Sequence, residues 1–184
     1  MPTTWTSTST PTKWDVINNY GSHTAHSGTK RAVTKGSATN DSLIKATSTV
    51  GYKNLVLSYW YKVDDAISSS KHVITEWSND SGLSWNQLFD LTNTDTTTWT
   101  QNVLNLPTDA ATPNADNTAG FQFRFRSTLS SGKKVSFDDV LLTGTPMPGS
   151  IIVHENVIDP DDNEVVDNHS FTVQLNGAND TGVT

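Results

Sequence analysis

The chain has 184 residues, a formal net charge of −7 and an isoelectric point near 5.0. Because binding to a phosphate backbone needs clustered Lys and Arg side chains, this acidic balance argues against a nucleic-acid partner. The absence of cysteine excludes disulfides, thiolate zinc sites and cysteine nucleophiles. No apolar run reaches membrane-spanning length, so we expect no membrane insertion in this segment.

The composition predicts an all-β fold with one full domain and a fraction of a second. Apolar residues make up only 34% of the chain, but six Trp, six Phe and four Tyr provide large side chains for a core. Thr, Val and aromatic residues favour strands, and Gly, Asn and Asp favour the turns between them.

Residues 1–12 form a Thr/Ser/Pro-rich run that buries little, and we interpret it as a mobile linker from which Trp5 is the candidate exception. From residue 13 onward, short β-type runs alternate with turn clusters, as in a sandwich or barrel. These runs are KRAVTK, DSLIKAT, KNLVLSYWYKV, KHVITEWS, SWNQLFDLT, TWTQNVLNL, GFQFRFRST and KKVSFDDVLLTG.

Two of these runs have faces that can be assigned from alternation. The run 53–63 carries apolar bulk on both faces, which is typical of a central strand. In the run 121–126, Phe residues alternate with Gln122, Arg124 and Arg126. We therefore predict a strand with one buried face and one solvated face.

The stretch TPMPG, residues 145–149, contains two prolines that lack an amide donor, so we place a domain boundary there. The predicted domain is 13–145, and 146–184 is a partial second segment. That segment contains two strand candidates whose apolar residues lack enough chain to enclose them, and two strands alone are marginal in water. Self-association through residues 150–176 is one expectation; the residues concerned are Ile151, Val153, Phe171, Val173 and Leu175.

The order of several motifs resembles bacterial extracellular jelly-roll modules, a group that includes carbohydrate-binding modules and MAM-like adhesion domains. The motifs are Trp14 followed by GSHTAHSGTKRA, then GYKNLVLSYWYKV, WSNDSGLSW, FQFRFRS and VSFDDVLLTG. The resemblance implies a two-sheet antiparallel jelly-roll sandwich, often a structural calcium ion, and an extracellular or cell-surface location. Residues 149–184 resemble the opening of an immunoglobulin-like or prealbumin-like adhesin repeat.

The segment from Ser78 to Trp85 fits the Asp-box pattern S-x-D-x-G-x-x-W. Asp80 is suited to accept hydrogen bonds from backbone amides in the turn, Gly82 to adopt a positive φ, and Trp85 to cover the hairpin. We interpret it as a structural turn, because a sialidase would also need repeated boxes, an arginine triad and a tyrosine nucleophile.

Asp138 and Asp139 are adjacent carboxylates in the most family-like strand. The resemblance implies that this region contributes to a calcium site, and hard oxygen ligands suit Ca²⁺. We predict a stabilising ion there, with oxygens from residues 26–28 and Asp41 as further ligands; a solvated bend or a turn cap is the alternative. Asp159, Asp161, Asn163 and Asp167 match part of a calcium loop, but Glu164 and Ser170 occupy the glycine and glutamate positions, which favours an acidic turn.

A sugar-binding platform needs an exposed aromatic ring and planar donors. Trp60, with Gln122, Arg124 and Arg126, provides these groups if the two strands share a face. The alternative is that Trp60 packs in the core and the arginines pair with surface acids.

No assembled catalytic pattern is present, so we predict that the chain is not an enzyme. His23 and His26 lack a third metal ligand and are interpreted as part of a polar turn. The predicted function is a binding (adhesin) module that recognises a glycan or a surface protein. The alternatives are a structural or assembly subunit and an accessory domain of a secreted glycoside-active enzyme.

Overall fold

The computed structural model describes residues 5–8, 13–19, 24–34, 40–64, 66–108, 110–129 and 133–148. The chain divides into two units, Met1–Pro148 and Gly149–Thr184, and every described residue belongs to the first. The predictions on His23, on the strand candidates of 150–176 and on the acidic turn at 159–170 lie outside the described residues.

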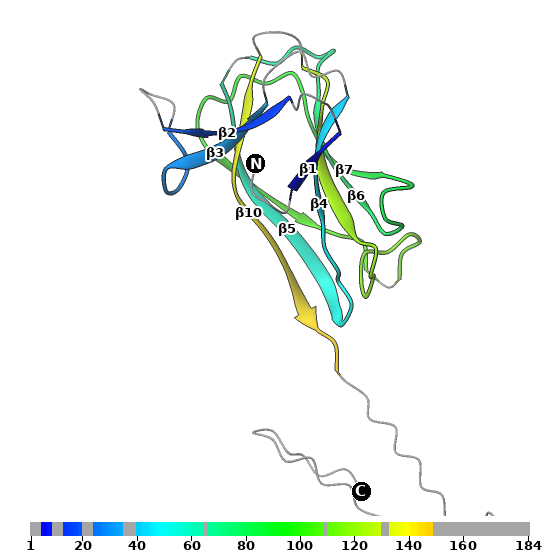
Figure 1. Cartoon of the computed structure of the whole chain (residues 1–184). Coiled ribbons are helices and arrows are strands. Elements are labelled where there is room, and N and C mark those ends of the chain that lie inside the picture. Colours follow the sequence, from blue (N-terminus) through cyan, green and yellow to red (C-terminus); the bar gives the residue numbers. More distant parts are fainter. Residues whose placement is uncertain are drawn as a thin grey trace, which may run out of the picture. The chain divides into compact units, whose positions relative to one another are not determined.

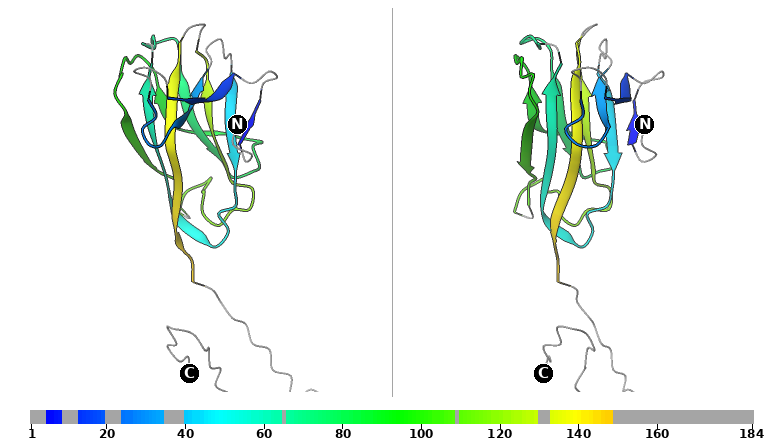
Figure 2. Two further views of the ribbon diagram at one scale, coloured as in Figure 1. Left: turned by 60° about the vertical axis from the view of Figure 1, so that its left-hand side comes forward. Right: turned by 90° about the vertical axis from the view of Figure 1, so that its left-hand side faces the viewer.

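The described chain forms two antiparallel five-stranded sheets, which confirms the predicted all-β jelly-roll sandwich (Figures 1 and 2). One sheet, called here the β9 sheet, contains in order β1 (Trp5–Ser7), β4 (Asp41–Ala46), β9 (Gln122–Ser127), β6 (Val73–Ser78) and β7 (Asn86–Leu91). The other, the β5 sheet, contains β2 (Trp14–Asn18), β3 (Lys30–Thr34), β10 (Val135–Pro146), β5 (Tyr52–Val63) and β8 (Thr100–Asn105). Among the described residues, no helix is long and apolar enough to cross a membrane.

The core lies between the sheets and is rich in aromatic side chains. From β9, Phe123 and Phe125 point inward, and the Phe125 ring stacks on Phe137 of β10 with centroids 4.4 Å apart. From β5, Tyr59 is 1% exposed, and its hydroxyl lies 2.6 Å from the Thr75 hydroxyl across the core. Burial raises the pKa of Tyr59 to about 12 despite hydrogen bonds with Thr75 and Asn102, so this phenol stays neutral.

The predicted faces of the two patterned strands agree with the structure. β9 alternates half-buried polar residues with buried Phe, so it has one inward and one outward face. β5 pairs with β10 on one side and β8 on the other, as a central strand does (Figure 2). On its inward face Leu55, Leu57 and Tyr59 are almost fully buried and Tyr61 is half-buried, and Trp60 on the outward face is half-buried as well.

The two ends of the domain add detail to the sequence-based expectations. Trp5, the candidate exception within the predicted linker, lies in β1 (Trp5–Ser7), and its ring packs edge-on against Phe123 with centroids 5.4 Å apart. β10 continues to Pro146, although we expected pairing to stop at Thr145. Pro146 stands opposite Tyr52, and Met147 N donates to Gly51 O at 2.8 Å, so a proline at the end of the ladder is accommodated.

Candidate ligand-binding face

The structure separates the predicted sugar platform into two places. Trp60 lies on the outer face of the β5 sheet, whereas Gln122, Arg124 and Arg126 lie on the outer face of the β9 sheet. The core stands between these faces, so Trp60 and the arginines cannot contact one ligand molecule in the way that a single platform requires. The condition that the two strands share a face is not met.

Trp60 lies in an aromatic cluster on the β5 sheet. The His26 ring stacks on the Trp60 ring, with centroids 3.8 Å apart and an interplanar angle of 13°. Trp99 meets the edge of His26 at 5.9 Å, and the Lys62 ammonium lies 5.5 Å from the centre of the Trp99 ring. One side of Trp60 is therefore occupied by the chain itself.

The His26–Ser27 turn is held by the two adjacent carboxylates of β10. His26 N and Ser27 N both donate to Asp138 Oδ2, at 2.8 and 3.2 Å. Ser27 Oγ donates to Asp139 Oδ1 at 2.5 Å, and His26 Nδ1 lies 2.7 Å from Asp139 Oδ2. The HSG and FDD motifs, more than a hundred residues apart in sequence, thus form one contact.

Asp139 sits at an irregularity that turns its side chain toward this contact. Its φ is +47°, and the register between β10 and β5 shifts between Asp138 and Leu141. Asp tolerates this left-handed region better than most residues. The hydrogen bonds from Ser27 and His26 lower the pKa of Asp139 below its ordinary value.

The third predicted calcium ligand lies in the other sheet. Asp41 is the first residue of β4, where it is 1% exposed and accepts hydrogen bonds from Ser7 Oγ, Thr8 Oγ1 and Lys13 N. Within the described ranges, no group of three or more His, Asp or Glu side chains is arranged to hold a metal ion. The calcium site stays a prediction, and the structure shows protein donors on each of the carboxylates concerned.

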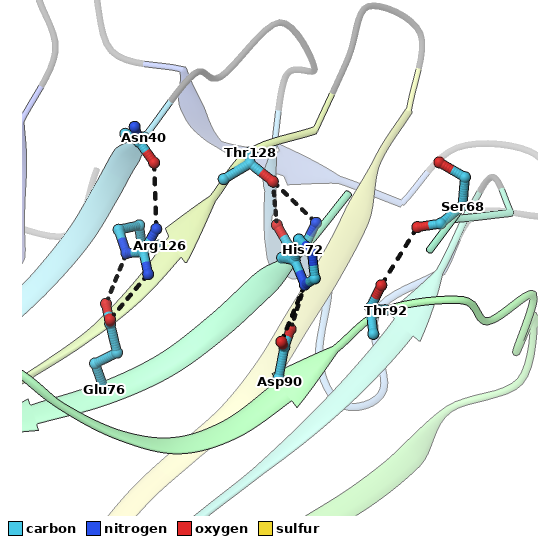
Figure 3. A network of polar contacts seen from close by, with 8 residues as sticks. All are labelled: Asn40, Ser68, His72, Glu76, Asp90, Thr92, Arg126 and Thr128. Carbon is cyan, nitrogen blue, oxygen red and sulfur yellow. Dashed lines mark hydrogen bonds and ion pairs between the residues drawn. The ribbon is translucent and has the colours of Figure 1, made fainter. Parts of the chain in front are cut away.

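A charged network lies on the outer face of the β9 sheet, and Figure 3 shows part of it. Glu76 of β6 stands opposite Arg124 of β9, so these two side chains share the outward face. Glu76 Oε2 accepts from Arg124 Nε at 2.7 Å and from Arg126 Nε at 2.9 Å, while Glu76 Oε1 accepts from Arg126 Nη2 at 3.0 Å. Arg126 Nη1 also donates to Asn40 Oδ1 at 3.2 Å.

Glu76 is well shielded for a residue on an outer face, with 7% of its side chain exposed. Burial alone would raise the pKa of Glu76, but hydrogen bonds from Arg126 and Arg124 outweigh that effect and lower it. Glu76 is therefore ionised at neutral pH and orients both guanidinium groups.

Arg124 connects this network to Trp85. Its guanidinium carbon lies 4.0 Å from the centre of the Trp85 ring, in cation–π geometry. Gln122 Oε1 and the Trp85 ring both approach Gly82, at 3.0 and 3.3 Å from where a Cβ on that residue would stand. An aromatic ring, a guanidinium and an amide thus meet at one end of the outer face.

The Asp80 turn positions Trp85. Asp80 Oδ1 accepts from Ser78 Oγ at 2.6 Å and from Ser84 N at 2.9 Å, and these contacts lower the pKa of Asp80 to about 2. Gly82 has a φ of +87°, as expected from the sequence. Because a side chain there would meet both Trp85 and Gln122, glycine fits this position on steric grounds as well.

The other end of the face carries a histidine–carboxylate pair. His72 Nδ1 lies 3.0 Å from each oxygen of Asp90 (Figure 3). Arg126 and Asp90 both stand opposite Ile74 on either side of β6, so this pair lies beside the Glu76 network.

Three residues of this face were not predicted from the sequence as members of a binding site, namely Glu76, Asp90 and Trp85. Glu76 lies in the run KHVITEWS, where its apolar neighbours favour a buried strand and give no sign of a charged surface site. The only available signal was cross-strand: one acid in β6 and two bases in β9, which become neighbours once the strands pair.

The chain matches no protein-family model and no curated protein sequence. Several solved structures share its fold. A family 61 carbohydrate-binding module, solved with β-1,4-galactotriose, has a TM-score of 0.58 and 13% identity over 78% of this chain and 90% of its own. The K1 adhesin domain of Lys-gingipain from Porphyromonas gingivalis has a TM-score of 0.57 and 18% identity over 79% and 93%.

A xylan-binding domain of family 22 from Paenibacillus barcinonensis is also similar, with a TM-score of 0.52 and 11% identity over 80% of this chain and 89% of its own. At these identities the likeness concerns the fold. The chain therefore has the β-sandwich architecture found in carbohydrate-binding modules and bacterial adhesin domains, in agreement with the resemblance that the sequence motifs indicated.

Proposed function

We propose that the chain is a non-catalytic, extracellular glycan-binding module whose binding site is the outer face of the β9 sheet. The observation that carries this proposal is the assembly of Trp85, Arg124 and Gln122, oriented by Glu76 and the Asp80 turn. Support for the class of ligand comes from the fold, which is shared with modules solved with or named for glycans.

The chemistry of this face suits a saccharide. A pyranose presents C–H groups that pack on flat side chains and hydroxyls that pair with amides and guanidinium groups. Because Glu76 and Trp85 fix the Arg124 guanidinium before any ligand arrives, binding loses less side-chain entropy there than at a flexible cation.

Binding to an oligosaccharide array by wild type and two single-Trp variants tests the proposal. We expect Trp85→Ala to weaken binding about tenfold or more, because it removes the ring that supports Arg124. Trp60→Ala is the matched control on the opposite sheet and should leave affinity unchanged. Loss of binding in Trp60→Ala with retention in Trp85→Ala would move the site to the β5 sheet, and a blank array for folded wild-type protein would contradict glycan binding.

A second candidate function is protein binding, and it is favoured by two exposed apolar side chains on the β5 sheet. Leu141 and Val103 flank Ser58 in register and are 56% and 58% exposed. The partner is either another surface protein or, as expected from residues 150–176, a second copy of this chain.

Light scattering of the full chain and of a version ending at Pro148 separates these partners. Ending the shorter chain at Pro148 keeps β10 complete. Self-association through residues 150–176 predicts assembly of the full chain only. Equal monomers at high concentration would contradict self-association through residues 150–176.

A further inference from the structure

We infer that the glycan bound by the β9 sheet is acidic, a saccharide carrying a hexuronate carboxylate, and that Arg124 pairs with that carboxylate. This inference rests on the proposed function and specifies its ligand class. It follows from which hydrogen-bond donors on the face are already in use and which are not.

The donors of the two arginines are used unequally. Arg126 gives Nε and Nη2 to Glu76 and Nη1 to Asn40, so each of its nitrogens is engaged. Arg124 gives only Nε to Glu76. Within the described part of the chain, Nη1 and Nη2 of Arg124 make no hydrogen bond.

Those two nitrogens form the end of a rigid plane. The guanidinium is held through Nε at 2.7 Å from Glu76 and lies 4.0 Å from the centre of the Trp85 ring. The terminal nitrogens of a guanidinium present parallel N–H groups whose spacing matches the two oxygens of a carboxylate. A neutral hydroxyl uses only one of these donors at a time, whereas a carboxylate accepts from both.

The local charge also favours an anion. Two guanidinium groups share the single carboxylate of Glu76, so these three side chains carry one net positive charge. Asp90 lies beside Arg126, at the end of the face away from Trp85, and both of its oxygens contact His72. Asp80, near Trp85, accepts hydrogen bonds from Ser78 and Ser84 within its own turn.

The net charge of the whole chain argues against non-specific attraction of acidic glycans. With a formal net charge of −7, the protein as a whole repels acidic polymers, so binding of one would require a local site such as Arg124. Trp85 and Gln122, both against Gly82, supply contacts for the uncharged part of the sugar next to the Arg124 plane.

The test compares each acidic oligosaccharide with its own carboxyl-reduced form. Oligomers of galacturonate, glucuronate and mannuronate are titrated against the full chain, and so are the same oligomers after reduction of each carboxylate to a primary alcohol, which keeps the linkage and removes the charge. We expect one acidic oligomer to bind at least about tenfold tighter than its reduced form, with a preference that weakens as salt is added.

Two variants test whether Arg124 causes the preference for the acidic oligomer over its reduced form. Arg124→Gln should bring the affinities of the acidic and reduced forms close together. Lys134→Gln removes the same charge from an exposed residue that precedes β10 in the β5 sheet and should keep the preference. Thermal melting checks that both variants are folded.

The outcomes separate this inference from the proposed function. Binding of neutral and acidic forms with equal affinity would overturn the acidic ligand and leave glycan binding intact. Absence of binding to every oligosaccharide would contradict the proposed function itself. A preference that survives Arg124→Gln, or that is lost equally in Lys134→Gln, would show that general charge and not the Arg124 plane is responsible.

Discussion

The two outer faces of the sandwich use their polar side chains differently. On the β5 sheet, Asp138 and Asp139 fasten the turn of residues 26–27 to the sheet, and the His26 ring is placed on Trp60. On the β9 sheet, Glu76 fastens two arginines, and the outer nitrogens of Arg124 stay uncommitted within the described residues. On the β5 sheet, the chain's own side chains therefore cover the surface around Trp60. On the β9 sheet, Glu76 holds the arginine side chains in fixed orientations and leaves the surface open.

This difference explains why a Trp in a promising position is not by itself a ligand site. Trp60 and Trp85 are both half-buried on outer faces. Trp60 is stacked by a ring from a distant segment, whereas Trp85 is stacked by a cation that brings unused donors with it. What surrounds the ring decides whether a ligand finds partners there.

The largest expected effect comes from removing Glu76. Glu76→Ala leaves two guanidinium groups without their shared carboxylate on a partly shielded face, which should lower the free energy of unfolding by about 2 kcal/mol. It should also weaken glycan binding, because Arg124 loses its orientation. Urea denaturation and the array measure the two effects, and a variant as stable as wild type would show that the network contributes little to the fold.

The corresponding change on the other face is Asp139→Asn. It replaces the carboxylate that accepts from Ser27 and pairs with His26, so we expect a loss of about 1 kcal/mol, because the contact is partly exposed. Tryptophan fluorescence should change as His26 moves from Trp60. Glycan affinity should stay at the wild-type value, since the β9 sheet is untouched, and a parallel loss of affinity would show that the faces are coupled.

Carboxylates on both faces should make the free energy of unfolding fall in acid. The pKa values of Glu76 and Asp139 are lower in the folded protein than their ordinary values of 4.5 and 3.8. A lowered folded pKa means that the stabilisation is present above the ordinary pKa and is lost as pH falls through the folded one. We therefore expect the midpoint of urea denaturation to be level near neutrality and to fall below about pH 4.5. Glu76→Gln and Asp139→Asn should each flatten part of that fall, and unchanged profiles would assign it to other carboxylates.

The sequence predicts much of the fold because the determining signals are local. Alternation in 121–126 gave the buried and solvated faces of β9, and the run 53–63 gave a central strand. The φ of Gly82 followed from turn chemistry. These features depend on period and on backbone preference, which a single stretch of sequence contains.

The candidate site depends on which strands become neighbours, and this is not local. The sequence allowed Trp60 and Arg124 to share one face, because the residues around each do not indicate that β5 and β9 belong to different sheets. Glu76 became a partner of the arginines only through pairing of β6 with β9. The link between residues 26–27 and Asp139 likewise required the arrangement of distant segments, although the resemblance had placed both motifs in one region.

The smallest expected effect concerns calcium. If calcium bound only the folded state, a calcium concentration a hundredfold above the dissociation constant would add about 2.7 kcal/mol to the free energy of unfolding. The melting temperature would then rise on the order of 10 °C.

An ion at Asp138 and Asp139 would have to compete with the amides of His26 and Ser27 and with the Ser27 hydroxyl, which already donate to these carboxylates. We therefore expect calcium to raise the melting temperature, but by less than this limit, and chelator to reverse the rise. Thermal melting of wild type and Asp139→Asn, with and without calcium, measures this. A rise near 10 °C that Asp139→Asn abolishes would establish that the ion displaces the turn's donors and that the β5 face is a metal site.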